Sequence, residues 1–262
     1  MRPILAIAGT TVGEAIRRRV LLVILLIGVL FLVVAPGLGV LSARQETTVL
    51  KSMMLGIIQL TSALIAIVLT VYMLPNEVER RTIYTILSKP VQRWQFLIGK
   101  YLGAVAALGV MMLLMTTILS VVFAIQQGFN PAGIAELVQA PLMYFVQMSL
   151  LAAVGIFFST FVTPLVNFFL TGGTFLLGSL FSPFFKSLAE NASVNPVTKN
   201  VAMLINTIIP NFAEYNVQNP IINPGSVITN PAQYYLFATI YGVVYIGILL
   251  VAGILIFDRR EV

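Results

Sequence analysis

The most regular feature of the sequence is the alternation of long apolar runs with short polar stretches. Six runs contain no Asp, Glu, Lys or Arg, and they cover residues 20–41, 53–73, 101–125, 142–161, 164–185 and 234–257. Each run has about the 20 residues that a helix needs to cross roughly 30 Å of hydrocarbon. The pattern therefore predicts an all-α, polytopic membrane protein in which residues 1–262 form a single domain with six spans.

The segment before the first run has the pattern of an amphipathic helix. Its apolar residues recur at roughly helical spacing, at Ile4, Leu5, Ile7, Ala8, Val12, Ala15 and Ile16. Polar residues occupy much of the other side, as in helices that lie in the membrane interface. We therefore expect an interfacial helix over residues 3–19, in which Arg17, Arg18 and Arg19 anchor the topology.

The composition agrees with a membrane protein and limits its chemistry. Hydrophobic residues make up 59% of the 262 residues and charged residues 9%, whereas about 25% of a soluble domain is charged. The chain has no cysteine and no histidine, and no HExxH or GxSxG pattern that would indicate a hydrolase. We expect a non-catalytic protein that binds no metal and no cofactor of its own. Because no predicted span holds a charge, transport by this chain would need an external source of energy.

The basic residues predict the orientation. If the N-terminus is cytoplasmic, eleven basic side chains lie inside and four outside, a clear positive-inside bias. The inner set is Arg2, Arg17, Arg18, Arg19, Arg80, Arg81, Lys89, Arg93, Lys100, Arg259 and Arg260, and the outer set is Arg44, Lys51, Lys186 and Lys199. The C-terminus is then cytoplasmic as well. The net charge of +6 indicates contact with anionic membrane lipids rather than with nucleic acid.

The connections between the runs differ in length. Residues 42–52 and 126–141 are expected to be short external loops, and Val162 and Thr163 form a tight internal turn. The longest connection, residues 182–233, is predicted to be external and contains four Asn-Pro turn signals. Its apolar stretch at 201–209 is too short to cross a bilayer. We therefore expect an interfacial or re-entrant helix there, packed over the outer ends of the spans.

The cytoplasmic segment 76–100 carries most of the candidate functional residues. Asn76 can cap a helix whose first turn holds Glu77 and Glu79, where carboxylates favour the positive end of the helix dipole. We expect this helix over residues 76–87, with an apolar and a charged side, before the chain re-enters the interface. The candidate contact residues are Glu77, Glu79, Arg80, Arg81, Thr82, Ile83, Ile86 and Leu87, and the interface anchors are Arg93, Trp94 and Lys100. The alternative is a solvated loop that only fixes the topology.

The motifs of this segment resemble those of a known family. Glu77-x-Glu79-x-x-Thr82, then Leu87-Ser88-x-Pro90-Val91-x-Arg93, then Gly99-Lys100 resemble the loop of ABC-2 type permeases, the six-span membrane subunits of ATP-binding cassette exporters. The loop is most similar to the branch with the permease of the nitrous oxide reductase maturation transporter and the gliding-motility permeases. Arg81 departs from it, because a glycine commonly precedes the threonine there.

The resemblance implies a function and partners. Residues 76–87 would be a coupling helix seated in a cleft of a separate ABC ATPase subunit, which binds the ATP. The permease would work as a pair in the bacterial inner membrane and export its substrate.

Three alternatives stay open at this stage. The second permease can be another copy of the chain or a related protein. The small residues Gly99, Gly103, Ala107, Gly172, Gly173 and Gly178 permit close helix approach either between copies or within one. The chain can export a lipid, a hydrophobic peptide or a small sulfur compound, or it can be a non-transporting scaffold that transmits force from the ATPase.

Overall fold

The computed structural model of the chain describes residues 2–39, 46–73, 92–129, 131–190, 195–216 and 230–259. The elements that these residues form are all helical. In chain order they are α1 (Arg2–Arg17), α2 (Arg19–Gly39), α3 (Glu46–Val71), α6 (Arg93–Gln127), α7 (Pro131–Ser159), α8 (Pro164–Leu176), the π-helical turn η1 (Leu177–Phe181), α9 (Ser182–Glu190), α10 (Pro196–Ile208), the 3₁₀ turn η2 (Ala213–Tyr215) and α11 (Pro231–Arg259).

Six helical stretches of the described residues are long and apolar enough to span a membrane. They cover residues 19–37, 49–71, 93–126, 133–159, 164–189 and 232–259. The predicted all-α polytopic fold is thereby confirmed. The loop expected over residues 126–141 is wrong, because α7 begins at Pro131 and includes Pro141. A proline is tolerated inside a membrane helix where neighbouring groups satisfy the freed carbonyl.

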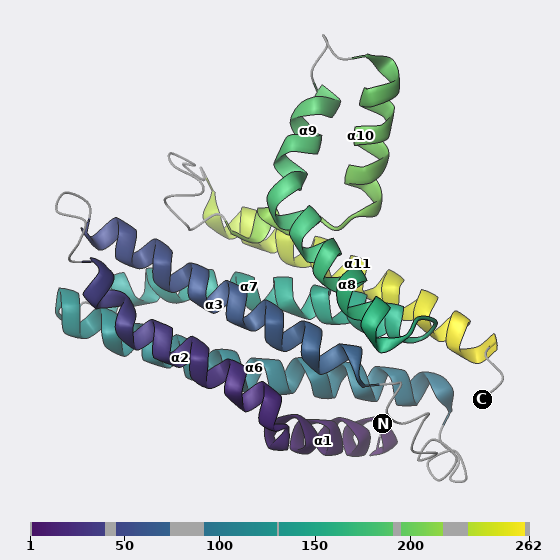
Figure 1. The fold of residues 1–262 in the computed structure, drawn as a ribbon, viewed down its shortest axis with the longest axis horizontal. Coiled ribbons are helices and arrows are strands. Elements are labelled where there is room, and N and C mark those ends of the chain that lie inside the picture. Colours follow the sequence, from purple (N-terminus) through teal and green to yellow (C-terminus); the bar gives the residue numbers. More distant parts are fainter. Residues whose placement is uncertain are drawn as a thin grey trace.

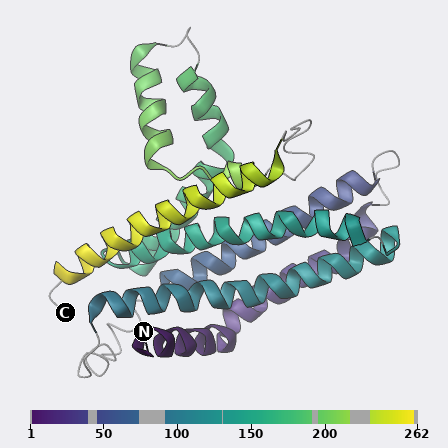
Figure 2. The same ribbon diagram turned by 180° about the vertical axis from the view of Figure 1, so that it is seen from behind.

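The spans form an elongated bundle around α3, as Figures 1 and 2 show. The central helix α3 contacts α2, α6, α7 and α8. Its side chains Met54, Ile58 and Ile65 are fully buried, and so is Tyr144 of α7. The apolar core of the protein therefore lies along α3 and α7.

The elongated bundle has two ends that differ in the helices they contain. The helix α1, the last turns of α3 and α11 and the first turn of α6 lie at one end (Figure 1). Near the opposite end, Lys51 of α3 and Glu136 of α7 form an ion pair of 3.3 Å. The end with α1 also holds Arg93 and Arg259. The orientation of the chain in a membrane stays a prediction.

Helices α9 and α10 form a hairpin that projects from the side of the bundle, which we call the arm (Figures 1 and 2). Within it, the Ser182 hydroxyl donates to Asn206 Oδ1 at 3.2 Å. The expectation that residues 201–209 pack over the ends of the spans is wrong, since Val201 and Leu204 are more than half exposed. The reason is that the helix already begins at Pro196 and its inner face packs on α9.

Candidate functional site

The predicted coupling residues lie outside the described part of the chain. These residues are Glu77, Glu79, Arg80, Arg81, Thr82, Ile83, Ile86 and Leu87. The structure does describe the two ends to which residues 74–91 are joined, at Met73 after α3 and at Gln92 before α6. The site is therefore built from the contacts that hold these ends.

Two glycines let α6 pack closely against α1. A Cβ atom at Gly99 would lie 2.9 Å from Ile7 Cβ, and one at Gly103 would lie 2.5 Å from Thr11 Cβ. Both distances are too short for carbon atoms, so the contact requires glycine at both positions. The sequence left open whether these glycines pack between two copies of the chain or within one copy. The structure shows that Gly99 and Gly103 pack within one chain. Gly178 likewise meets Phe212 of its own chain.

The helix α1 has a buried side, an apolar exposed side and a polar side. Thr11 and Ala15 are buried against the rest of the chain. Leu5 and Ile16 are exposed, whereas Glu14 lies on the polar side. The apolar residues of the sequence pattern thus divide between α6 and the open surface. The location of α1 in a membrane interface stays a prediction.

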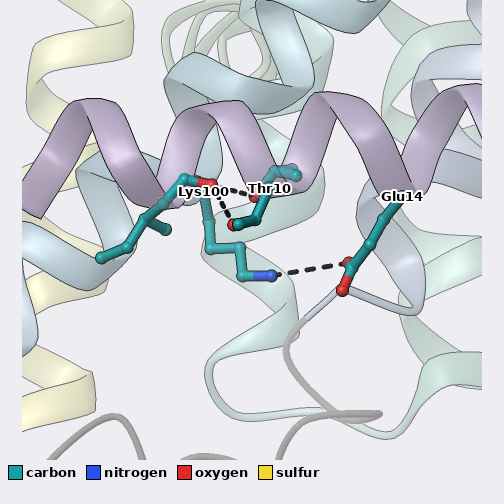
Figure 3. Close-up of polar contacts among 5 residues, drawn as sticks. Thr10, Glu14 and Lys100 are labelled. Carbon is teal, nitrogen blue, oxygen red and sulfur yellow. Dashed lines mark hydrogen bonds and ion pairs between the residues drawn. The ribbon is translucent and has the colours of Figure 1, made fainter.

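A charge contact joins α6 to α1. Lys100 Nζ lies 3.8 Å from Glu14 Oε2, and Figure 3 shows the ammonium directed at this carboxylate. The Lys100 side chain is 4% exposed and that of Glu14 58%. Nζ also lies 5.8 Å from the centre of the Phe96 ring. A nearly buried ammonium depends on such partners, so Lys100 lies inside the α1–α6 contact, although we expected it to anchor the chain in the membrane interface.

The Thr10 hydroxyl does not bind the Glu14 carboxylate. The hydroxyl of Thr10, one turn before Glu14, donates instead to the Ile7 carbonyl at 2.8 Å (Figure 3). Sequence reasoning did not select Glu14. The signal was present, because Glu14 is the first acidic residue of the chain and no other occurs before Glu46.

The first turn of α6 also holds the last turn of α11. The Arg93 guanidinium donates to the carbonyl oxygens of Phe257 at 3.0 Å and of Asp258 at 3.2 Å. It lies 5.9 Å from the centre of the Phe257 ring, which stacks on Phe96 with 6.4 Å between ring centres. The last carbonyls of a helix have no partner inside the helix and carry partial negative charge, so a cation stabilises them.

The other predicted anchor residues lie at the protein surface. Trp94 is exposed, and its indole N–H donates to the Gln92 side chain. Arg17, Arg18 and Arg19 lie at the break between α1 and α2, with Arg17 and Arg19 exposed. This placement is compatible with the topological role that the sequence predicts.

The turn that joins α7 to α8 lies at the same end of the bundle. Ser159 and Thr160 are buried, and their hydroxyls donate to the carbonyls of Ile156 at 2.6 Å and Phe157 at 2.7 Å. Phe161 is exposed. The tight turn that the sequence predicts is present, and its polar groups are used locally.

Together these contacts connect the start of α6, which follows residues 74–91 in the chain, to α1 and to the end of α11. The first turns of α6 are held to α1 by Gly99, Gly103 and Lys100, and to α11 by Arg93. Among the described residues, no group of three or more His, Cys, Asp or Glu side chains is placed to hold a metal. The arrangement is suited to transmitting a displacement between helices, because closely packed elements move as units.

Comparison with known proteins identifies a family relationship. Residues 5–262 match the family described as ABC-2 family transporter protein. The match includes residues 74–91 as well as all six spans. No curated protein matches the sequence.

Proposed function

The chain belongs to the ABC-2 family of transporter proteins and is a multi-pass membrane permease subunit; from this premise we propose that ATP hydrolysis by a separate subunit drives it to export a hydrophobic substrate. Membership in the family implies association with an ABC ATPase. We further propose that two permease chains form the path in the bacterial inner membrane, with both termini in the cytoplasm.

The connection between residues 74–91 and the packed helix ends carries this proposal. A partner that moves residues 76–87 pulls on the first turn of α6, to which these residues are joined through residues 88–92. That turn is attached to α1 through Lys100 and Glu14, and to α11 through Arg93. A displacement imposed by an ATPase therefore reaches three helices. A loop that only fixed the topology would not need such an attachment.

Two double variants test the coupling helix. Reversing its charge with Arg80→Glu and Arg81→Glu, or removing its apolar side with Ile83→Ala and Leu87→Ala, should weaken copurification with the ATPase. Truncating a buried anchor in an interface typically costs more than about 1 kcal/mol, and about 1.4 kcal/mol is tenfold in affinity. Membrane insertion should persist, because Arg17, Arg18 and Arg19 still set the topology.

The control reverses two charges on the arm, with Lys186→Glu and Lys199→Glu. Both lysines lie on α9 and α10, far along the chain from the coupling segment, so this variant should retain the ATPase. Retention of ATPase binding and transport by both coupling variants at normal expression would refute the assignment of residues 76–87.

A scaffold that transmits force without moving a substrate is the second candidate function. The attachment of α6 to α1 and α11 serves either function, since both begin with a stroke of the ATPase. Stimulation of ATP hydrolysis by a transported compound in the reconstituted complex supports export. The relationship to the nitrous oxide reductase maturation and gliding-motility branch stays a prediction.

A further inference from the structure

Residues 210–216 form a buried, largely non-helical segment between α10 and α11, which we call the plug. Phe212 is 0% exposed and Tyr215 2%, yet the only regular element of the plug is the short turn η2. Irregular backbone inside a membrane protein requires partners for its N–H and C=O groups. The plug therefore depends on specific groups of the bundle.

Groups on α7 and η1 bind two backbone groups and one side chain of the plug. The Gln147 side-chain amide donates from Nε2 to the Phe212 carbonyl at 3.0 Å. The Phe212 N–H donates to the Gly178 carbonyl, also at 3.0 Å. The Tyr144 hydroxyl donates to Asn216 Oδ1 at 2.5 Å.

Tyrosine hydroxyls join the plug to α11. The Tyr215 hydroxyl of the plug donates to the Ala238 carbonyl at 3.0 Å. On α11, the Tyr234 hydroxyl donates to the Glu214 carbonyl at 2.8 Å, and the Tyr241 hydroxyl accepts from the Asn211 N–H at 3.2 Å. Burial raises the pKa of Tyr215 well above its usual range, so this hydroxyl keeps its proton and remains a donor.

Two glycines shape the space that the plug fills. A Cβ atom at Gly178 would lie 2.3 Å from the Pro210 carbonyl oxygen, and one at Gly242 would lie 2.7 Å from the Tyr215 hydroxyl. The Phe212 ring lies 5.8 Å from that of Phe175, centre to centre. The plug thus fits closely, but the chain before it leads directly into the projecting arm. Because the plug has only seven residues, its withdrawal would expose less packed surface than the withdrawal of a whole span.

The hydrogen bonds of the plug reach the middle of the bundle. Gln59 lies near the centre of α3 and Gln147 near the centre of α7. Gln59 Nε2 donates to Gln147 Oε1 at 3.1 Å, which leaves Gln147 Nε2 directed at the Phe212 carbonyl. Gln147 is fully buried. If the plug withdraws, this buried donor loses its acceptor, a loss that costs free energy unless another acceptor replaces it.

We propose that the plug closes the substrate path and that the Gln147 amide binds a carbonyl oxygen of the substrate when the plug withdraws. In this closed structure, the Phe212 carbonyl accepts the hydrogen bond that the substrate carbonyl would accept in the open state. Gln59 is a positioning residue, because its hydrogen bond to Gln147 Oε1 orients the Gln147 amide. The inference rests on the proposed function and names its substrate class, an uncharged hydrophobic molecule that carries a carbonyl group. A charged substrate is disfavoured, because the six apolar runs contain no charge to pair with it.

The first experiment uses Ala238→Cys as a reporter beneath the plug. Ala238 is buried, its carbonyl accepts from Tyr215, and the chain has no other cysteine. Modification of the full-length chain in liposomes by an impermeant methanethiosulfonate reagent is measured in the parent and with Tyr144→Phe or Gln147→Leu added. Each substitution removes one bond to the plug and should raise the rate roughly tenfold, which corresponds to about 1.4 kcal/mol in the opening equilibrium.

The control reporter is Ala104→Cys, which is also buried but lies on α6. Its modification should stay slow in all three backgrounds. Equal modification rates of Ala238→Cys in the parent and in both variants would overturn the proposal that the plug opens. An equal acceleration at both reporter positions would also overturn it, because it indicates general loosening of the bundle.

The second experiment tests the ligand class in the complex with the ATPase. Oleamide, an uncharged fatty amide, should stimulate ATP hydrolysis several-fold in the parent and in Tyr144→Phe but not in Gln147→Leu. Octadecene, which has no carbonyl, should stimulate none of them.

Two outcomes would overturn the role of Gln147. One is that oleamide stimulates Gln147→Leu as strongly as the parent, and the other is that the parent does not respond to oleamide. If the chain assembles with no ATPase, the proposed function is refuted. The modification rates of Ala238→Cys still test whether residues 210–216 open, because that experiment needs no ATPase.

Discussion

At the scale of single residues, a missing side chain sets the distance between α1 and α6. A Cβ atom at Gly103 would lie 2.5 Å from Thr11 Cβ and 2.8 Å from the Ala8 carbonyl oxygen. The second neighbour is backbone, which cannot move aside without shifting the whole helix. Gly103 therefore contributes to the coupling site by shape alone.

We expect Gly103→Ala to separate α1 from α6 and to destabilise the protein. Overpacking of a close contact costs about 1–3 kcal/mol, and in a domain of this size each 1 kcal/mol lowers Tm by roughly 2–4 °C. Thermal unfolding of the purified protein in detergent measures the change. Gly173→Ala is the matched control, because a Cβ atom there meets nothing within 4 Å. Equal Tm values for the two variants would contradict the close-packing argument.

At the scale of elements, Arg93 joins the start of α6 to the end of α11. We expect Arg93→Ala to loosen the last turn of α11, since the carbonyls of Phe257 and Asp258 lose a charged donor. Hydrogen bonds to charged groups contribute about 1.5–3 kcal/mol when buried, and half-burial of Arg93 reduces this to about 1 kcal/mol.

Hydrogen exchange of the last turns of α11, measured by mass spectrometry, should accelerate about fivefold in Arg93→Ala. Arg93→Lys should restore part of the protection, because an ammonium reaches a carbonyl but lacks the planar fork of a guanidinium. Arg19→Ala, which removes an exposed arginine at the first residue of α2, should leave α11 unchanged. Unaltered exchange in Arg93→Ala would show that Arg93 does not hold α11.

The spans were predictable because their signal is local. A run of about 20 residues without charge identifies a membrane helix wherever its neighbours lie. The ends of the helices were less predictable, as α6 shows. It begins at Arg93 rather than at residue 101, because Arg93 and Lys100 find partners on α11 and α1. Those partners are distant in sequence, so the sequence pattern indicated Gly99 and Lys100 but not the role of Glu14.

The burial of residues 210–216 was not predictable from local pattern. Residues 210–216 contain Pro210, two asparagines and Glu214, a composition typical of a surface turn. The burial of the plug depends on Tyr144 and Gln147 of α7 and on the space at Gly178. None of these residues is close to it in sequence, and only the tertiary arrangement brings them together.

At the scale of the whole molecule, α7 links the two functional regions. It carries Tyr144 and Gln147, which hold the plug, and it ends at the same end of the bundle as the α1–α6 contact (Figure 1). It also contacts α3, α6, α8 and α11. A displacement that starts at the end of the bundle next to residues 74–91 in the chain can therefore change the position of Gln147 relative to the plug. This mechanism requires that this end of the bundle lies in the cytoplasm, where ATP is available.

The orientation of α6 tests this requirement directly. Gln92 and Gln126 lie at opposite ends of α6 and are both exposed, so Gln92→Cys and Gln126→Cys form a matched pair in a chain that has no other cysteine. An impermeant maleimide added to intact cells should label Gln126→Cys, and it should label Gln92→Cys only after permeabilisation. The reason is that Arg93, Lys100 and the arginines at the α1–α2 break favour the cytoplasmic side. Labelling of Gln92→Cys in intact cells would place residues 74–91 outside, where no cytosolic ATPase can reach them, and would refute the orientation and the coupling site together.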